Sequence, residues 1–309
     1  MKKIFFIISV VILILVGAGY FAGNYFVDFA LKRNIETGSP PPATKNIADP
    51  SIKVPPEPNF KKEIWEITSA DNLKLHASYF SPTEESHRWA VLVHGYGRDQ
   101  RFAFDYAEEY LKDGWNVLTP DLRAAGTSEG IYITMGTFES QDIILWAEKI
   151  IERDPQAKII FHGVSMGAAT VLMAAALEPK NLCAVVEDCG YTNAYEMFSA
   201  QLEKIFNVPA APIMPAVDIV CKIKTGAKVS DAAPIKSIEK INVPIFFIHG
   251  DSDKLVPYKM AEELFDKSNA PVKEFWKVEG AGHADAKSQD PQKYFEKVFN
   301  FVDTYAKSK

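Results

Sequence analysis

The chain contains little cysteine: its 309 residues include Cys183, Cys189 and Cys221 and no others. Three cysteines cannot all pair within one chain, and none has metal-ligand spacing with another cysteine or with a histidine. We therefore expect neither a disulfide framework nor a metal site. Cys183 lies in an apolar run and is expected in the core, whereas the sequence leaves a disulfide between Cys189 and Cys221 open.

A strong excess of one charge is also missing, because 34 Lys and Arg face 40 Asp and Glu, which gives a net charge of −6. Basic residues do not cluster with aromatic residues, so the chain lacks the electrostatic footprint of a nucleic-acid-binding protein. Its apolar and charged fractions are those of an ordinary globular protein. The length suffices for one large α/β domain with additional segments.

One long apolar run lies near the amino terminus. Residues 4–23 carry no charge, and about 20 such residues at 1.5 Å each span a hydrocarbon core of roughly 30 Å. We predict that residues 1–33 form an uncleaved, single-pass signal anchor in the cell membrane. Aromatic residues at the end of the run fit an interfacial belt, namely Tyr20, Phe21, Tyr25 and Phe26.

The charges beside this run bear on its orientation. Lys2 and Lys3 favour an inner amino-terminal tail and an extracytoplasmic position for the rest of the chain, although Lys32 and Arg33 on the other flank weaken that orientation. The alternative is a signal peptide cleaved near residues 16–18, which would release a secreted protein. We favour the anchor because the run is longer than the apolar part of a typical signal peptide.

Prolines dominate the next segment, residues 34–59. Such a segment can neither continue a helix nor join a sheet interior, so we predict an extended linker. From residue 60 the pattern changes, and the alternating stretches 63–68 and 73–79 predict an antiparallel hairpin with one face in water. We predict that one domain occupies residues 60–309.

Beyond the hairpin, short apolar runs alternate with helical patterns. This alternation predicts a parallel sheet with helices on both faces and functional residues at the carboxyl ends of the strands. The hairpin makes the predicted sheet mixed. The predicted strands are 89–94, 115–119, 157–162, 182–186, 243–249 and 273–278, and the predicted helices are 102–113, 137–153, 168–177 and 291–307.

The interval between Glu187 and Ile241 contains no strand-like run. It holds amphipathic pieces at residues 194–206 and 213–223 that are separated by prolines. An insertion here would lie over the carboxyl ends of the strands. We predict a small helical cap at about residues 190–235, and the alternative is a set of extra helices on one face of the sheet.

The most informative motif is the pentapeptide Gly163-Val164-Ser165-Met166-Gly167, which lies between a predicted strand and a predicted helix. This is the arrangement of a nucleophile elbow. The two glycines let strand and helix pass closely, and the start of the helix favours a developing oxyanion. We predict that Ser165 is a nucleophile, and the alternative is a plain glycine-rich turn.

An activated serine needs a general base. His283 follows the last predicted strand in a flexible Gly-Ala-Gly-His-Ala loop, from which an imidazole can reach Ser165, so we predict His283 as the base. The other histidines have simpler roles: His94, His162 and His249 end buried strands and are expected to fix turns, whereas His76 and His87 are expected in solvent.

The base in turn needs an orienting acid. Asp253 lies far enough into the loop after strand 243–249 to turn toward His283, so we predict it as the acid. Asp251 is expected to cap the following turn, and Glu187 and Asp188 are less favoured sources. The oxyanion donors are predicted to be the backbone N–H groups of Tyr96 and Met166.

With these motifs in place, the chain from about residue 60 resembles the α/β-hydrolase-fold serine hydrolases. It is similar to a bacterial, often membrane-anchored group of esterase-like and serine aminopeptidase-like proteins. The resemblance implies a mostly parallel central sheet with an antiparallel N-terminal hairpin, helices on both faces and a small helical cap. One departure is Ala124-Ala125, where the family commonly has Arg-Gly-His-Gly-like residues. The segments that carry the resemblance are residues 94–97, 121–130, 163–167, 250–257 and 282–283.

The predicted function is hydrolysis of a carboxylic ester through a Ser-His-Asp triad and an acyl-enzyme, with a small-molecule or peptide acyl substrate and without metal or organic cofactor. A peptidase or aminopeptidase, a lipase or thioesterase, and a non-catalytic membrane-displayed binding protein are the alternatives. The oligomeric state is left open. Candidate carboxylates for a substrate amine are Glu187, Asp188, Glu196 and Glu203, and candidate apolar lid residues are Phe198, Ile205, Phe206, Ile213 and Met214.

Overall fold

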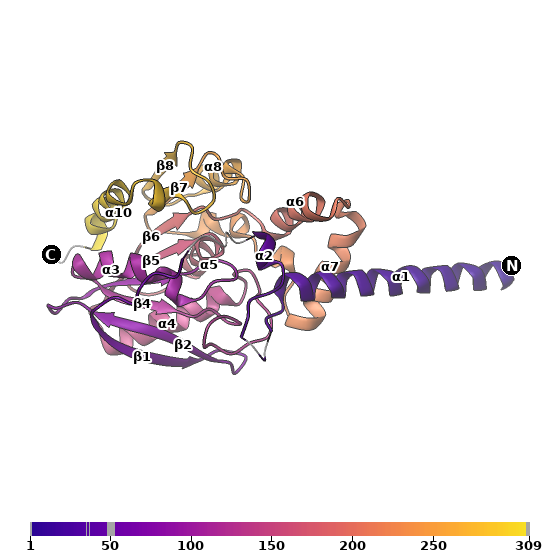
Figure 1. Ribbon diagram of the computed structural model, residues 1–309, viewed down its shortest axis with the longest axis horizontal. Helices are drawn as coiled ribbons and strands as arrows, with labels where there is room; N and C mark the ends of the chain where they lie inside the picture. Colours follow the sequence, from indigo (N-terminus) through magenta and orange to yellow (C-terminus); the bar gives the residue numbers. More distant parts are fainter. Residues whose placement is uncertain (1, 35, 37, 48–52, 307–309) are drawn as a thin grey trace.

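The computed structural model describes residues 2–34, 36, 38–47 and 53–306. Eight strands form one sheet in the order β1-β2-β4-β3-β5-β6-β7-β8 (Figure 1). β1 pairs with β2 and β2 with β4 in antiparallel register, whereas the remaining neighbours are parallel. The strands are β1 (Lys61–Thr68), β2 (Lys74–Ser81), β3 (Arg88–Val93), β4 (Asn116–Pro120), β5 (Lys158–Val164), β6 (Leu182–Asp188), β7 (Ile245–Gly250) and β8 (Lys273–Val278).

Two hydrophobic layers enclose the sheet because neighbouring residues of a buried strand point to opposite faces. In β5, Ile160 joins the layer under α3 (Phe104–Lys112) and α10 (Pro291–Ala306). Phe161 joins the layer under α4 (Glu139–Arg153), α5 (Met166–Ala175) and α8 (Tyr258–Lys267). This is the α/β-hydrolase fold, and the predicted mixed sheet is confirmed.

The hydrolase fold also contains a short helix, α9 (Ala286–Gln289), and single 3₁₀ turns: η1 (Gln100–Ala103), η2 (Val229–Asp231), η3 (Pro234–Lys236) and η4 (Ile238–Lys240). η1 begins the helix expected at 102–113. α8 is an amphipathic helix of 10 residues that the strand and helix predictions did not include.

Two helices occupy the interval in which a cap was predicted. α6 (Ala194–Phe206) begins at Asn193, whose side chain accepts the N–H of Tyr195. α7 (Ala210–Thr225) follows and ends at Gly226 with a positive φ of 84°. Figure 1 shows both helices beside the base of α1, at one end of the sheet. The prediction of helical segments here is confirmed.

α1 (Lys2–Leu31) is a continuous helix of 30 residues. Its first part is exposed and projects away from the rest of the molecule (Figure 1). By length and apolar composition it qualifies to cross a membrane. Near its end, Gly23, Val27 and Leu31 are buried, and α1 packs along α7.

Part of the predicted linker lies against the hydrolase fold. Arg33 donates to the carbonyl oxygens of Gly126 at 2.6 Å and Ser128 at 2.7 Å. A short helix, α2 (Thr44–Ile47), follows, and Thr44 is buried. Residues 48–52 of the linker lie outside the described residues. Cys189 and Cys221, left open as a pair by the sequence, are both buried free thiols.

Candidate active site

Ser165 lies between β5 and α5 on a sharp turn, with φ 58° and ψ −117°. A positive φ is uncommon for a residue with a Cβ and marks local strain. The flanking glycines make the turn possible: a Cβ on Gly163 would overlap the carbonyl group of Gly167, and a Cβ on Gly167 would overlap the carbonyl oxygen of Val93. The turn at Ser165 therefore has the backbone geometry of the predicted nucleophile elbow.

His283 and Asp253 complete a continuous line of hydrogen bonds from Ser165. The Nε2 atom of His283 lies 2.8 Å from the Oγ of Ser165, and its Nδ1 lies 2.6 Å from the Oδ2 of Asp253. The other carboxylate oxygen accepts the N–H groups of Leu255 at 2.8 Å and Val256 at 2.9 Å. These bonds fix the carboxylate in one orientation.

A second histidine contacts the same carboxylate. The Nε2 of His249 lies 3.4 Å from Asp253 Oδ2 and 2.9 Å from the carbonyl oxygen of Val256. Burial opposes ionisation of Asp253, but the hydrogen bonds of His249 and His283 outweigh it and hold the pKa of Asp253 well below its usual range. The sequence analysis gave His249 only a turn-fixing role. Its spacing of four residues before Asp253 was the available signal.

The loop after β3 passes directly against the serine. A Cβ on Gly95 would lie 3.4 Å from the Cβ of Ser165, so the adjacent Tyr96 N–H is close to the site. Within the part of the chain that the structure describes, the backbone N–H groups of Tyr96 and Met166 make no hydrogen bond. Two unused donors beside a nucleophile are what an oxyanion hole requires.

Of the two remaining strand-end histidines, His94 holds a loop as expected, whereas His162 contacts side chains of two helices. His94 is buried, and its Nε2 accepts the N–H of Leu122 at 3.1 Å. His162 lies between the hydroxyl groups of Tyr110 at 3.1 Å and Tyr294 at 3.0 Å. Burial lowers the pKa of His162 to about 3, so this ring is neutral near pH 7.

The carboxylates that competed with Asp253 have other partners. Asp251 accepts the N–H of Gly280 at 2.7 Å, in the loop after β8, and so joins two loops instead of capping its own turn. Asp188 accepts the hydroxyl group of Tyr294 at 2.8 Å. Glu187 accepts the N–H of Gly190. The carboxylate that is bonded to His283 is that of Asp253.

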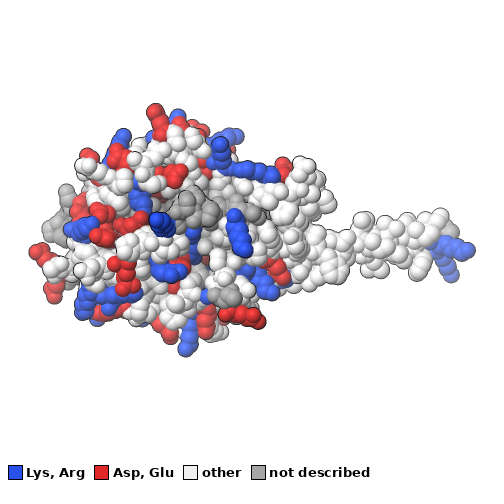
Figure 2. Space-filling model, in the orientation of Figure 1, with Lys and Arg blue, Asp and Glu red and all other residues white. Residues whose placement is uncertain are grey.

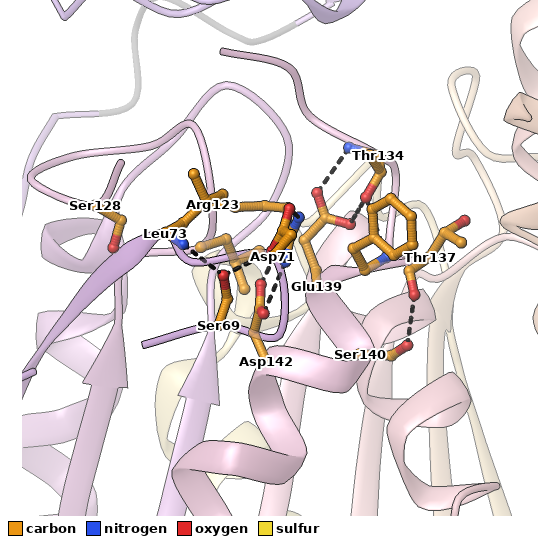
Figure 3. Close-up of polar contacts among 12 residues, drawn as sticks. Ser69, Asp71, Leu73, Arg123, Ser128, Thr134, Thr137, Glu139, Ser140 and Asp142 are labelled. Carbon is orange, nitrogen blue, oxygen red and sulfur yellow. Dashed lines mark hydrogen bonds and ion pairs between the residues drawn. The ribbon is translucent and has the colours of Figure 1, made fainter. Parts of the chain in front are cut away.

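An ion-pair network around the buried Arg123 holds the loop after β4, the segment that departs from the family at Ala124-Ala125. Arg123 bridges Asp142, at 2.8 Å, and Asp71, at 2.9 Å (Figure 3). Asp142 is buried, and burial raises its pKa to about 6 although Arg123 opposes the shift. Close by, Glu139 accepts the N–H of Thr134 at 2.7 Å (Figure 3). These contacts hold the loop to α4.

Among the residues that the structure describes, one group of side chains has the spacing of metal ligands. Ligand atoms of Cys189, Asp253 and His283 lie within 4.8 Å of one another. Asp253 and His283 already bond each other, and His283 bonds Ser165. The arrangement therefore has the geometry of a serine nucleophile, a base and an orienting acid, which can perform acyl transfer.

Comparisons with known proteins identify the family of the chain. Residues 102–309 match the model of the prolyl oligopeptidase family. The Bacillus subtilis protein YqkD is 26% identical over 246 residues, which cover 79% of this chain and 80% of that protein. The human alpha/beta hydrolase domain-containing protein 17B is 27% identical over 41% of this chain and 43% of its own length.

Solved structures share the fold. An esterase from Pyrococcus furiosus superposes with a TM-score of 0.68 at 24% identity, over 84% of this chain and 100% of the other. The acylaminoacyl peptidase of Pyrococcus horikoshii superposes with a TM-score of 0.60 at 16% identity, over 82% of this chain and 43% of the peptidase. At these identities the likeness establishes the fold.

Proposed function

Because the chain belongs to the prolyl oligopeptidase family of α/β-hydrolases, we propose that it is a serine hydrolase that cleaves carboxylic esters. The observation that carries the proposal is the hydrogen-bonded line from Asp253 through His283 to Ser165. A serine on a strained elbow, bonded to a histidine that is itself oriented by a buried carboxylate, is an activated nucleophile.

The proposed reaction follows from these contacts. His283 Nε2 takes the hydroxyl proton as Ser165 Oγ attacks the ester carbonyl carbon. The N–H groups of Tyr96 and Met166 stabilise the oxyanion, and the leaving alcohol departs with the proton from His283. Water then attacks the acyl-enzyme, with His283 again as base, and releases a carboxylic acid and free Ser165. Asp253 keeps Nδ1 protonated and orients the ring throughout.

Two of the four candidate carboxylates for a substrate amine are unsuited to an aminopeptidase. An aminopeptidase needs a carboxylate that is free to bind the substrate amine. Of the four candidates, Glu187 and Asp188 are buried and bonded within the protein, and Glu196 and Glu203 are exposed on α6. Amide hydrolysis is the second candidate, because peptidases give the family its name.

We also propose that residues 1–33 anchor the enzyme as a single-pass helix and that the hydrolase domain lies on the extracytoplasmic side. The evidence for an anchor is that α1 is long and apolar enough to span a bilayer and that its apolar stretch is exposed. Lys2 and Lys3 support the orientation. The division into anchor, linker at residues 34–59, domain at 60–309 and cap at about 190–235 is part of this proposal.

The first test is active-site labelling of the full chain in detergent micelles with a fluorophosphonate probe, beside turnover of p-nitrophenyl acetate. Ser165→Ala should abolish labelling and lower turnover by about 10³-fold or more. Ser288→Ala, which removes a hydroxyl in the same region after His283, is the matched control and should behave as wild type. Labelling that persists in Ser165→Ala, or a folded wild type that neither labels nor turns over, would overturn the proposal.

A further inference from the structure

A narrow apolar cavity of about 50 Å³ lies between α1 and the cap. α1 supplies one wall, and α6 and α7 supply the others. Its lining is almost entirely hydrocarbon, with Gln201 as the polar exception. Residues from all three helices contribute, among them Val27, Ala30, Phe198, Leu202, Phe206 and Val217.

One end of this cavity adjoins the proposed oxyanion loop. The hydroxyl group of Tyr96 donates to the carbonyl oxygen of Ala30, and the Tyr96 ring meets Phe198 edge-on at 6.5 Å. Both partners line the cavity. Ala43 lines it as well, and its neighbour Thr44 contacts the position that a Cβ of Gly97 would occupy. The Tyr96 side chain thus stands between the cavity and the loop beside Ser165.

α7, which supplies one wall of the cavity, also contacts α1 at the end of its uncharged apolar run. Gly23 of α1 packs so closely on α7 that a Cβ there would lie 2.7 Å from the carbonyl oxygen of Ala216. Ala216 lies in the first half of α7, so this part of α7 lies against the end of the apolar stretch of α1. Apolar side chains also face outward here: Ile219 and Ile223 of α7 are 60% and 67% exposed.

The distribution of charged side chains also distinguishes α1 from the body of the molecule. Figure 2 shows the projecting part of α1 without acidic or basic side chains except at its tip, whereas the body carries both signs. An exposed apolar surface that continues from a membrane-spanning helix onto a cap fits contact with lipid.

From these contacts we propose that the cavity receives the hydrocarbon chain of an ester drawn from the bilayer, with the ester carbonyl at Ser165. The inference rests on the proposed ester hydrolysis and names its substrate class: a membrane lipid ester. The chain would enter along α1 and α7, and the polar part would remain on the water side of Tyr96. Hydrolysis adds one water and releases a fatty acid and the alcohol.

The test compares two probes on the full chain in phosphatidylcholine vesicles: 4-methylumbelliferyl oleate in the bilayer and 4-methylumbelliferyl acetate in water. Val217→Phe places a ring in the cavity and should lower the oleate-to-acetate ratio of kcat/KM at least about tenfold, while Phe206→Ala enlarges the cavity and should not lower the ratio. The ratio cancels any common loss of active enzyme. Val272→Phe, the same change at an exposed site after α8, is the matched control.

The outcomes separate the two proposals. Turnover of both esters with an unchanged ratio in Val217→Phe would overturn the lipid-chain proposal and leave ester hydrolysis intact. A wild type that hydrolyses acetate but not oleate would do the same. Failure of the folded wild type to label or to hydrolyse either ester would overturn ester hydrolysis itself, and with it this inference.

Discussion

At the scale of single residues, the buried acids around the site differ in what compensates their burial. Asp253 receives two backbone N–H groups and two histidines, so its pKa is depressed. Glu187, also fully buried, accepts one N–H, and its second carboxylate oxygen has no hydrogen-bond partner among the described residues. Burial raises the pKa of Glu187 to about 7, although the nearby His249 opposes the shift.

This shift predicts a pH-dependent stability that Glu187→Gln removes. The folded-state pKa lies above the ordinary value of 4.5, so between these values the folded protein binds more protons than the unfolded chain. The free energy of unfolding therefore falls as pH rises through this window, by up to about 3 kcal/mol. Glutamine keeps the acceptor for the N–H of Gly190 but cannot ionise. The free energy of unfolding of Glu187→Gln should therefore not fall across this pH window.

The measurement is the melting temperature of the full chain in detergent micelles at about pH 5 and about pH 7.5. Wild type should lose more stability over this interval than Glu187→Gln. Glu196→Gln, at an exposed position on α6, should keep the wild-type dependence. Equal slopes for wild type and Glu187→Gln would show that Glu187 is not held protonated by the fold.

At the scale of elements, the crossing of α1 and α7 joins the apolar helix to the cap. The two helices approach closely because Gly23 has no side chain, and Gly19, one turn earlier, lies beside Ala216. Small residues four apart allow such close helix packing. Lys224 of α7 adds an ion pair to Asp28 of α1 at 2.5 Å.

Gly23→Val should therefore separate these helices. A Cβ there would meet the backbone of Ala216 and a methyl group of Val220 at 2.7–2.9 Å. Such overpacking costs about 1–3 kcal/mol, which lowers the melting temperature by roughly 2–10 °C. Gly17→Val is the matched control, because nothing lies within 4 Å of its Cβ position. Identical melting of the two variants in micelles would contradict the packing described here.

At the scale of the whole molecule, the proposed anchor and catalytic domain form one packed arrangement. The end of α1 is buried on the cap, and Arg33 is bonded to the loop after β4. An anchor with these contacts would hold the cap at the bilayer surface, unlike an anchor joined through a free tether.

The whole-molecule prediction concerns retention and sidedness. The full chain should remain in the membrane pellet after an alkaline carbonate wash, because about 20 apolar residues hold it there. Protease added outside intact cells should digest the hydrolase domain and spare a cytoplasmic control protein. Recovery of a shortened chain from the medium would instead identify a cleaved signal peptide, and a protected domain would reverse the orientation.

The sequence alone determined much of this protein because the relevant signals are local. Apolar runs and alternation located the hairpin and the parallel strands, and the G-x-S-x-G motif between a strand and a helix located the elbow. Ser165 was predicted from that motif, and Asp253 and His283 were predicted because each lies in the loop after a predicted parallel strand. The carboxyl ends of these strands meet at one edge of the sheet, and the structure brings the three side chains into hydrogen-bond contact.

Tertiary packing decided the rest. No local pattern says that Asp251 would bond the loop after β8, or that the end of α1 would close a cavity against the cap. Such contacts depend on which helix faces meet across long sequence separations. For the same reason the proline-rich segment could be predicted as non-helical but not as partly packed at Thr44. Pattern fixes where chain elements lie in the sequence, while close packing fixes which side chains touch.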